Sequence, residues 1–261
     1  MIAPTDRGFT LGDGVFETVL ADAGRLVSWS RHLDRFGRAA RTLGLPPPDP
    51  ETCEAEALRV LAEAGLKGAR AAVRLTWSAG PGGRGLERPE ALHPRLTATA
   101  TPAHRPEGPA RLHMASAPRN ERSPLSRIKS LAYLENVLAR AEARAAGAEE
   151  AVMLNTRGEV ACAAAANVFW LAGGALHTPE LACGALDGLV RADLTEAARA
   201  LSIPVLETRA GPEALFEAEV VLLTNSLVGV RLAGFGETAP SATAERLARA
   251  VDALRAEVQV R

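Results

Sequence analysis

The sequence predicts a mixed α/β or α+β fold that is divided into two domains. Strand-like runs alternate with amphipathic helical runs along the chain. The 261 residues, 47% of them hydrophobic, are enough for one large core or two smaller ones. Residues 102–109 are rich in helix and strand breakers and mark a boundary. We therefore expect a small N-terminal α/β domain at 1–107 and a C-terminal domain at 108–261 that contains Lys129.

The N-terminal region alternates strands, turns and two helices. The spacing of apolar residues predicts strands at 15–20, 26–28, 71–77 and 95–101. Ser30 is expected to cap a helix that ends at Gly44, with its apolar face formed by Leu33, Phe36, Ala40 and Leu43. Asp49 and Pro50 have the residue types of an N-cap and a first helical turn, and this second helix runs to Ala64.

The C-terminal region repeats this alternation after a long helix. An apolar stripe of Leu131, Leu134, Leu138 and Ala141 predicts a helix that ends near Gly147. Strands are expected at 151–154, 159–162, 167–171, 176–178 and 220–223. Asp187 and Gly188 open a helix to Leu201, and a last helix carries Leu247, Val251, Leu254 and Val258 in phase.

Composition excludes several classes of protein. A net charge of −1 gives no global attraction to nucleic acid or to anionic membranes. No apolar run approaches the ~20 residues of a membrane span, and no signal-peptide core follows Met1. Three cysteines form neither a disulfide framework nor a metal spacing, and five scattered histidines indicate no metal site. We expect a soluble cytoplasmic protein.

Lys129 is the residue around which we organise the functional hypothesis. Of the 30 basic residues only Lys67 and Lys129 are lysines. Lysine, unlike arginine, can lose its proton and attack a carbonyl. Lys67 lies in a polar turn, whereas Lys129 precedes the apolar stripe of the long helix. Two interpretations are open at this point: a solvated lysine at a helix start, or a reactive amine that faces a cleft.

Two further segments have the residue types of binding sites. The glycine-rich loop 78–85 carries Arg84, and it lacks the Gly-Lys-Ser/Thr ending of a phosphate loop. It is either a flexible connection or a loop whose single guanidinium grips a carboxylate. The helix that starts after Gly188 has unpaired amides in its first turn, which predicts an anion site.

The order of short motifs resembles that of the fold-type IV pyridoxal-phosphate enzymes, the class IV aminotransferase family. The matching blocks cover nearly the whole chain. They are Asp6–Thr18, His32–Arg35, Gly82–Gly85, Lys129 with Tyr133, Asn167–Trp170, and Thr224–Leu227. The resemblance implies a two-domain fold like that of D-amino-acid aminotransferase, with a mixed-sheet, barrel-like C-terminal domain. It also implies pyridoxal 5′-phosphate as the cofactor and a homodimer.

The same resemblance implies roles for individual residues. Lys129 matches the lysine that binds the cofactor covalently and shuttles protons. Arg35 matches the arginine on the cofactor phosphate, and Tyr133 the tyrosine near its phenolic oxygen. Other matches are the phosphate contacts Leu189 and Val190 through their amides and Ser226 through its hydroxyl, and Arg84 for the carboxylate of a small-molecule substrate.

Three positions depart from the family pattern. Val190 replaces a threonine, and Ala79 replaces a common loop arginine. Cys162 replaces the glutamate that faces the pyridine nitrogen and keeps the cofactor ring protonated. A thiol stabilises that proton less than a carboxylate does. Enzymes of another pyridoxal-phosphate fold that catalyse eliminations place a hydroxyl at this nitrogen, and Cys162 is similar to that arrangement.

The residues 224–230 and the Gly-Gly-Arg-Gly loop resemble the aminodeoxychorismate lyase branch of the family more than the branched-chain branch. The leading hypothesis is a lyase that eliminates pyruvate from 4-amino-4-deoxychorismate in folate synthesis and leaves 4-aminobenzoate. The alternatives are an aminotransferase on branched-chain or D-amino acids, and a catalytically impaired homologue. Since little sequence precedes Asp6, we expect the N-terminal sheet to lack one strand that relatives carry.

Overall fold

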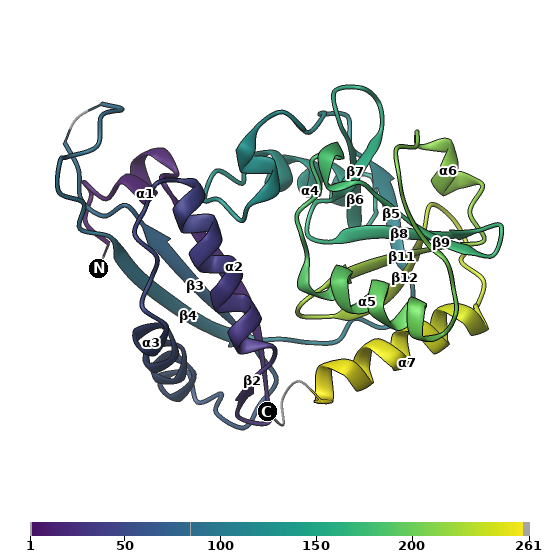
Figure 1. Ribbon diagram of the computed structural model, residues 1–261, viewed down its shortest axis with the longest axis horizontal. Coiled ribbons are helices and arrows are strands. Elements are labelled where there is room, and N and C mark those ends of the chain that lie inside the picture. The colour runs from purple at the N-terminus through teal and green to yellow at the C-terminus, as the bar shows by residue number, and fades with distance from the viewer. Residues whose placement is uncertain (1, 84, 258–261) are drawn as a thin grey trace. The chain divides into compact units, whose positions relative to one another are not determined.

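The computed structural model describes residues 2–83 and 85–257, which form two compact units (Figure 1). The first unit comprises residues up to His104 together with Ile128–Tyr133, and the second comprises Arg105–Arg127 and the chain from Leu134 onward. The first unit thus ends inside the segment 102–109, where the sequence predicted a boundary. Residues 128–133 differ from the prediction, because they return to the first unit instead of staying in the C-terminal domain.

The first unit is an antiparallel sheet covered on one face by two helices. Its strand order is β2-β1-β3-β4, and β1 pairs with β3 from Gly14 to Ala21. The elements are α1 (Arg7–Leu11), β1 (Gly14–Asp22), β2 (Arg25–Leu26), α2 (Trp29–Thr42), α3 (Pro50–Glu63), β3 (Ala71–Ser78) and β4 (Arg95–Pro102).

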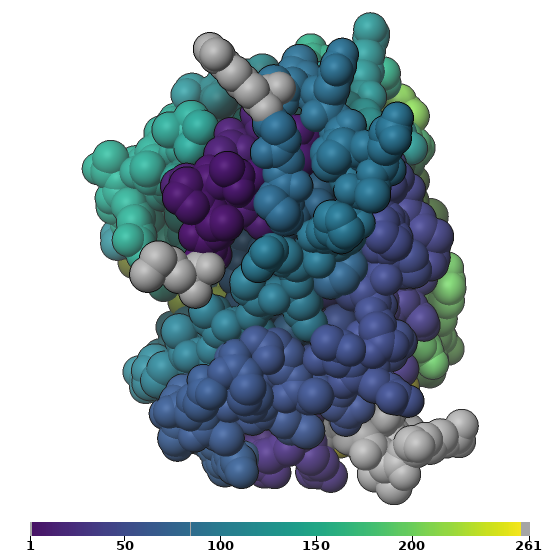
Figure 2. All heavy atoms as spheres, turned by 90° about the vertical axis from the view of Figure 1, so that its left-hand side faces the viewer, coloured from purple at the N-terminus to yellow at the C-terminus, as the bar shows by residue number. Residues whose placement is uncertain are grey.

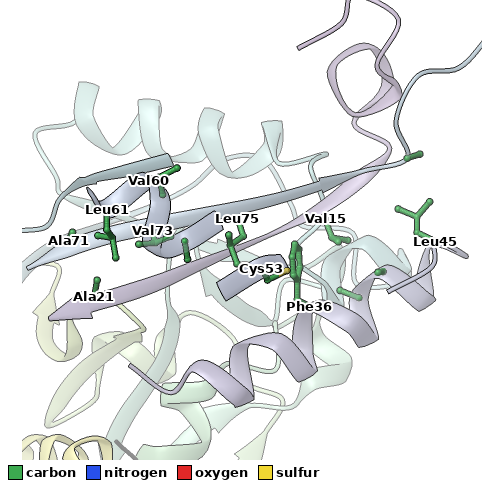
Figure 3. Packing of buried hydrophobic residues seen from close by; sticks show 14 residues of the cluster. Val15, Ala21, Phe36, Leu45, Cys53, Val60, Leu61, Ala71, Val73 and Leu75 are labelled. Carbon is green, nitrogen blue, oxygen red and sulfur yellow. The ribbon is translucent and has the colours of Figure 1, made fainter. Parts of the chain in front are cut away.

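Alternation along the strands decides which side chains meet the helices. Val15 and Ala21 of β1 and Val73 and Leu75 of β3 are buried against α2 and α3, where Phe36 fills the centre of the cluster (Figure 3). At the start of α3 the predicted cap is confirmed, since the Asp49 carboxylate accepts a hydrogen bond of 2.8 Å from the Thr52 amide.

The start of α2 was predicted wrongly. The N-cap is Ser28, with a left-handed φ of 54° and no side-chain cap bond, and Ser30 lies inside the helix. Trp29, the first residue of the helix, packs against the core cluster.

The second unit is built on a mixed eight-stranded sheet. Its order is β10-β9-β8-β11-β12-β5-β6-β7, and the sheet curls so that β7 contacts β8 and β9. The elements are β5 (Ala110–Met114), η1 (Pro124–Arg127), α4 (Leu134–Ala145), β6 (Glu150–Leu154), β7 (Val160–Ala163), β8 (Asn167–Ala172), β9 (Ala175–Pro179), η2 (Leu181–Cys183), α5 (Leu189–Ala200), β10 (Val205–Thr208), α6 (Glu213–Phe216), β11 (Val220–Asn225), β12 (Gly229–Gly234) and α7 (Ala242–Glu257).

Strand β8 is buried on both faces. Phe169 and Leu171 pack in a cluster with α5 and α7, while Val168 and Trp170 point to the opposite cluster, which β5, β6 and β7 complete. This α+β arrangement, with a curled mixed sheet, is the fold class that the sequence predicted. Among the described helices, none is both long and apolar enough to cross a membrane.

Helix α4 buries a face other than the one the sequence predicted. Its buried residues are Asn136, Ala139 and Ala143, and the two alanines pack with Met153 in a cluster on β6. Leu134 and Leu138, which belong to the predicted core stripe, are 67% and 57% exposed. The small alanine side chains allow the helix to lie close to the sheet, and the leucines remain on the outer face.

Candidate active site

Lys129 lies in an extended segment that adds to the edge of β1. The Phe16 amide donates a hydrogen bond of 2.8 Å to the Lys129 carbonyl, and the Leu131 amide donates one of 2.9 Å to the Gly14 carbonyl. Helix α4 begins only at Leu134, so Lys129 is not the solvated first residue of a helix. These two backbone bonds, at the Lys129 carbonyl and at the Leu131 amide, attach the segment that begins at Lys129 to β1.

The Lys129 amine lies among aromatic rings. Its Nζ is 4.4 Å from the centroid of the Phe16 ring and 5.7 Å from that of Tyr133. The two rings pack edge to face, with centroids 5.2 Å apart. Because Phe16 lies on the strand that pairs with the lysine segment, the sheet register itself brings ring and amine together.

This environment lowers the pKa of the Lys129 amine. The side chain is half-buried and keeps some contact with solvent. Burial lowers the pKa of Lys129 to about 8; Glu17 opposes this shift, and the positive charges of Arg35 and Arg74 reinforce it. Near neutral pH an appreciable fraction of the amine is therefore unprotonated, as a nucleophile or general base requires.

A buried cluster of charged residues lies between β1 and α2. Arg35 donates from Nε to Glu17 Oε1 (2.7 Å) and from Nη2 to Oε2 (2.8 Å), and His32 Nδ1 is 2.8 Å from the same carboxylate. Burial would raise the pKa of Glu17, but the charge of Arg35 and the two partners' hydrogen bonds outweigh it, and the pKa is lowered far below its usual range. The bidentate pair fixes the plane of the Arg35 guanidinium.

Burial lowers the pKa of His32, although its hydrogen bond to Glu17 and the charge of Glu17 act in the opposite direction. His32 is thus neutral at neutral pH. Glu17 and His32 were missed as site residues in the sequence. The available signal was the acid at position 17, which shares the buried face of β1 with Val15 and Val19.

Arg74 is a second residue that the sequence did not single out. Its guanidinium carbon lies 3.8 Å from the centroid of the Phe16 ring, and the side chain is exposed. Among the described residues, it has no hydrogen bond or ion pair. With Lys129, Arg74 makes the surroundings of Phe16 positively charged, which suits an anionic substrate.

The predicted site residues of the second unit either pack among apolar side chains or interact through their backbone groups. Cys162 of β7 is buried with Ala139, Ala143 and Met153. Burial raises the pKa of the Cys162 thiol, against the influence of the Arg119 charge and in the same direction as nearby glutamates. Cys162 is therefore a neutral thiol at neutral pH.

The predicted anion site lies at the start of α5. Its N-cap is Gly188, which makes no side-chain cap bond, and Leu189 and Val190 form the first turn. The Val190 side chain is buried in the core cluster of α5, α7, β8 and β11, so its amide alone is left for a ligand. Asn167 donates 2.8 Å to the Leu186 carbonyl, and its Oδ1 would lie 2.0 Å from a Cβ at position 188.

Ser226 follows β11, and its carbonyl accepts a hydrogen bond of 2.6 Å from Arg255 Nη2. Close by in the strand, the buried Thr224 hydroxyl makes no hydrogen bond to any described residue. Arg84, the predicted substrate residue, lies outside the described residues. In the first unit, Lys129, Tyr133 and Arg35 surround Phe16 and Glu17, while the predicted residues of the second unit occupy separate elements of that unit.

These residues fit pyridoxal phosphate. The first unit contains an amine with a pKa of about 8 and a guanidinium of fixed orientation, and the second unit, taken by itself, contains a glycine-capped helix start. An aldehyde, an aromatic ring and a phosphate are the groups that such residues bind.

Comparisons with known proteins agree with this donor set. The family model described as "Amino-transferase class IV" matches residues 14–233. The aminodeoxychorismate lyase of Vibrio harveyi is 30% identical over 230 residues, which cover 86% of this chain and 83% of that protein. A putative branched-chain-amino-acid aminotransferase of Methanocaldococcus jannaschii is also 30% identical, over 227 residues that cover 85% of this chain and 77% of that protein.

Among solved structures, a putative 4-amino-4-deoxychorismate lyase from Legionella pneumophila superposes with a TM-score of 0.87. It is 27% identical, and the match covers 97% of this chain and 95% of that chain. The family match spans most of the sequence, and the relatives match over most of their own length. The chain therefore belongs to the class IV aminotransferase family of pyridoxal-phosphate-dependent enzymes.

Proposed function

We propose that the protein is a pyridoxal-phosphate-dependent 4-amino-4-deoxychorismate lyase, which releases pyruvate and leaves 4-aminobenzoate for folate synthesis. The observation that carries the choice of lyase is Cys162, a neutral buried thiol where the family resemblance implies a glutamate. The lyase relative from Vibrio harveyi supports it. In this reaction the carbon that bears the amine loses a proton, the neighbouring C–O bond breaks, and the ring becomes aromatic.

When bound, the cofactor withdraws electrons from the carbon that bears the substrate's amine. In our proposal Lys129 is the residue that accepts the proton from this carbon. Its pKa of about 8 lies close enough to neutral pH for it to take and return a proton. Phe16 and Tyr133 limit where the amine can move, and the backbone bonds of the β1 edge hold the segment in place.

Arg35 would hold the cofactor phosphate, with its orientation set by Glu17. In the second unit, the proposed phosphate contacts are the amides of Leu189 and Val190 and the hydroxyl of Ser226. Arg74, exposed beside Phe16, and Arg84 are the candidates for a substrate carboxylate. Tyr133, the single tyrosine of the chain, would lie near the cofactor's phenolic oxygen.

Cys162 favours elimination over transamination for a chemical reason. A carboxylate stabilises a proton on the pyridine nitrogen, and a neutral thiol does not. Transamination needs the protonated ring more, because the electrons must remain delocalised until a proton is added back to the cofactor. In elimination the departing enolpyruvyl group takes the electrons away.

The second candidate is an aminotransferase. Its support is the Methanocaldococcus jannaschii relative, which is as similar in sequence as the lyase from Vibrio harveyi. Sequence identity therefore does not separate the two activities, and the distinction rests on Cys162 and on the resemblance of residues 224–230 and the Gly-Gly-Arg-Gly loop to the lyase branch.

The test is the ratio of pyruvate release to amino transfer. We expect the purified protein to release pyruvate from aminodeoxychorismate and to transfer amino groups from branched-chain or D-amino acids only slowly. Cys162→Glu should shift the ratio towards transfer, and Cys162→Ser should leave it close to that of the unchanged enzyme. An unchanged ratio in folded, cofactor-loaded Cys162→Glu would remove this support, and the lyase proposal would then rest on motif resemblance alone. Absence of both activities would favour an impaired homologue.

We also propose a homodimer in the cytoplasm. The outer face of α4 supports the dimer, because Leu134, Val137 and Leu138 are 67%, 56% and 57% exposed on it, and such an apolar stripe is typical of an interface. The double substitution Val137→Glu with Leu138→Glu should halve the mass measured by light scattering. A dimer that survives this change would have its interface elsewhere. The cytoplasmic location is supported by the composition alone, and cell fractionation would test it.

A further inference from the structure

The segment Asp6–Gly14 contains charged side chains and glycines that the proposed reaction does not use. It comprises the short helix α1 and the turn before β1. Arg7 and Asp6 are buried in it. It is a block of the family resemblance, yet none of its residues is among those expected to touch cofactor or substrate.

Arg7 binds the loop between β3 and β4 through three consecutive carbonyls. Its guanidinium donates to Gly85 (3.3 Å), Leu86 (2.9 Å) and Glu87 (3.0 Å), and its Nε donates to Asp13 at 2.9 Å. Figure 2 shows the dark purple N-terminal segment against the blue chain of this loop region. Since Arg7 is only 3% exposed, the loop is tied to a group that cannot turn to water.

Asp13 extends the attachment by one residue. Besides Arg7, it accepts hydrogen bonds from Arg88 Nε (3.0 Å) and Nη2 (2.5 Å), and Arg88 Nη1 donates 2.6 Å to the Leu43 carbonyl at the end of α2. Burial acts to raise the pKa of Asp13, but Arg88 and Arg7 lower it on balance. The Asp13 carboxylate thus binds Arg88 directly and is linked to Gly85 through Arg7. Both ends of the segment 85–88 are therefore attached to the rest of the unit.

The glycines of the same segment face the residues that follow Lys129. A Cβ at Gly8 or Gly14 would lie 3.1 or 2.8 Å from Leu131 Cδ1. Gly12, with a φ of +69°, would place one 3.3 Å from the Ala132 amide nitrogen. At position 12 only glycine permits both the left-handed backbone and this close approach to Ala132. The segment therefore contacts the loop with its charges and the lysine segment with its glycines.

We propose that Asp6–Gly14 is a positioning element that couples the loop 85–88 to the Lys129 segment, with Arg7 as its central positioning residue. In this proposal Arg7 acts through the loop, whose carbonyls it binds, and through Asp13. Arg7 keeps the loop in one conformation. Substrate binding therefore does not have to offset the entropic cost of ordering the loop. The expectation for KM rests on the proposed function, whereas the expectation for loop protection does not.

The first test is Arg7→Lys in the holoenzyme, which keeps the charge and loses the planar fork. We expect glutamyl endopeptidase to cut after Glu87 about tenfold faster or more, because cleavage requires local opening of the loop. We expect KM to rise about tenfold and kcat to stay within about twofold. The control is Arg59→Gln, which removes an exposed arginine of the same unit and should leave all three values unchanged.

Cleavage at the rate of the unchanged enzyme would overturn the proposal, as would a loss confined to kcat. A third outcome is that Arg7→Lys is cleaved faster, while neither the variant nor the unchanged enzyme turns over any substrate. This outcome would support the positioning element and contradict the proposed function.

The second test compares two glycines with the same backbone conformation. Gly12 and Gly65 both have a φ of +69°, but a Cβ at Gly65 would meet nothing within 4 Å. Gly12→Ala and Gly65→Ala therefore share the conformational strain, and only the first pushes on Ala132. We expect Gly12→Ala to lower kcat at least about fivefold more than Gly65→Ala does and to speed the loss of cofactor on dialysis. Equal effects of the two substitutions would overturn the coupling to the lysine segment.

Discussion

The two units hold their candidate site residues by different means. In the first unit charged side chains do so: Glu17 binds Arg35 and His32 in a buried cluster. In the second unit the backbone and apolar packing do so: Gly188 starts α5 without a side-chain cap, and Val190 is part of a core. Removing one side chain of a buried charge cluster leaves its charged partners buried without a counter-charge. A backbone amide, in contrast, is still present after most substitutions. We therefore expect the first unit to be far more sensitive to mutation.

The largest effect is expected for Lys129→Ala. In the proposed mechanism Lys129 provides both the covalent link to the cofactor and the proton acceptor, so turnover should fall at least about a thousandfold without its amine. Lys129→Arg should be equally inactive, because arginine keeps the charge but cannot lose the proton. Lys67→Ala is the matched control, since Lys67 is the other lysine and is exposed. Turnover and the visible spectrum of the bound cofactor are the measurements, and an active Lys129→Ala enzyme would refute the site.

Glu17→Gln tests the charge cluster of the first unit. It leaves the positive charge of Arg35 buried without its acid, and the free energy of unfolding should fall by about 3–5 kcal/mol. Because Glu17 raises the pKa of Lys129, its removal should lower that pKa further. Denaturant unfolding measures the first effect. Glu56→Gln on the exposed pair with Arg59 is the control and should change little, and a similar loss in both variants would contradict the special status of the buried cluster.

The pH dependence of stability isolates the cost of burying Lys129. Its pKa falls from 10.5 to about 8 on folding, so between these values the unfolded chain binds a proton that the folded chain has released. The free energy of unfolding of the cofactor-free protein should therefore rise with pH across this window, by up to about 3 kcal/mol from this residue. The measurement is the difference between the unchanged protein and Lys129→Met from pH 7 to 10. If the free energies of unfolding of the two proteins changed in parallel with pH, the Lys129 amine would not be buried as its surroundings indicate.

How far the sequence predicts this molecule depends on the kind of interaction. Alternation and caps predicted β1, β3 and α3 correctly, because these elements depend on local pattern. The apolar stripe of α4 was assigned to the wrong face, since alanines can pack closer to a sheet than leucines and periodicity alone does not choose between them. Lys129 was found from its rarity, but its place beside Phe16 follows from a pairing between residues far apart in the chain.

The charge cluster was out of reach for a similar reason. His32 and Arg35 share one face of a helix, but nothing local pairs them with an acid on a strand. Cys162 and Val190 could be assigned roles only through family resemblance, and their roles towards the cofactor remain predictions. Alternation along β1 places Glu17 on the buried face, but the partners of Glu17 and Arg74 follow from how the strands and α2 pack and had to await the structure.

The smallest effect is expected for Val190→Thr, which tests the second unit. The substitution restores the residue type that the family resemblance implies at this position. The Val190 side chain, however, packs with α7 and the sheet, so a hydroxyl there would be buried in an apolar cluster. We expect the free energy of unfolding of the cofactor-free protein to fall by about 1–2 kcal/mol. The dissociation constant of the cofactor should stay within about twofold of its original value, because the amide is unchanged. Val190→Ala keeps the same amide without a hydroxyl and should bind the cofactor equally well. If Val190→Thr alone bound the cofactor several-fold more tightly, the second unit would recognise the phosphate through a side chain, and the contrast between the two units would fail.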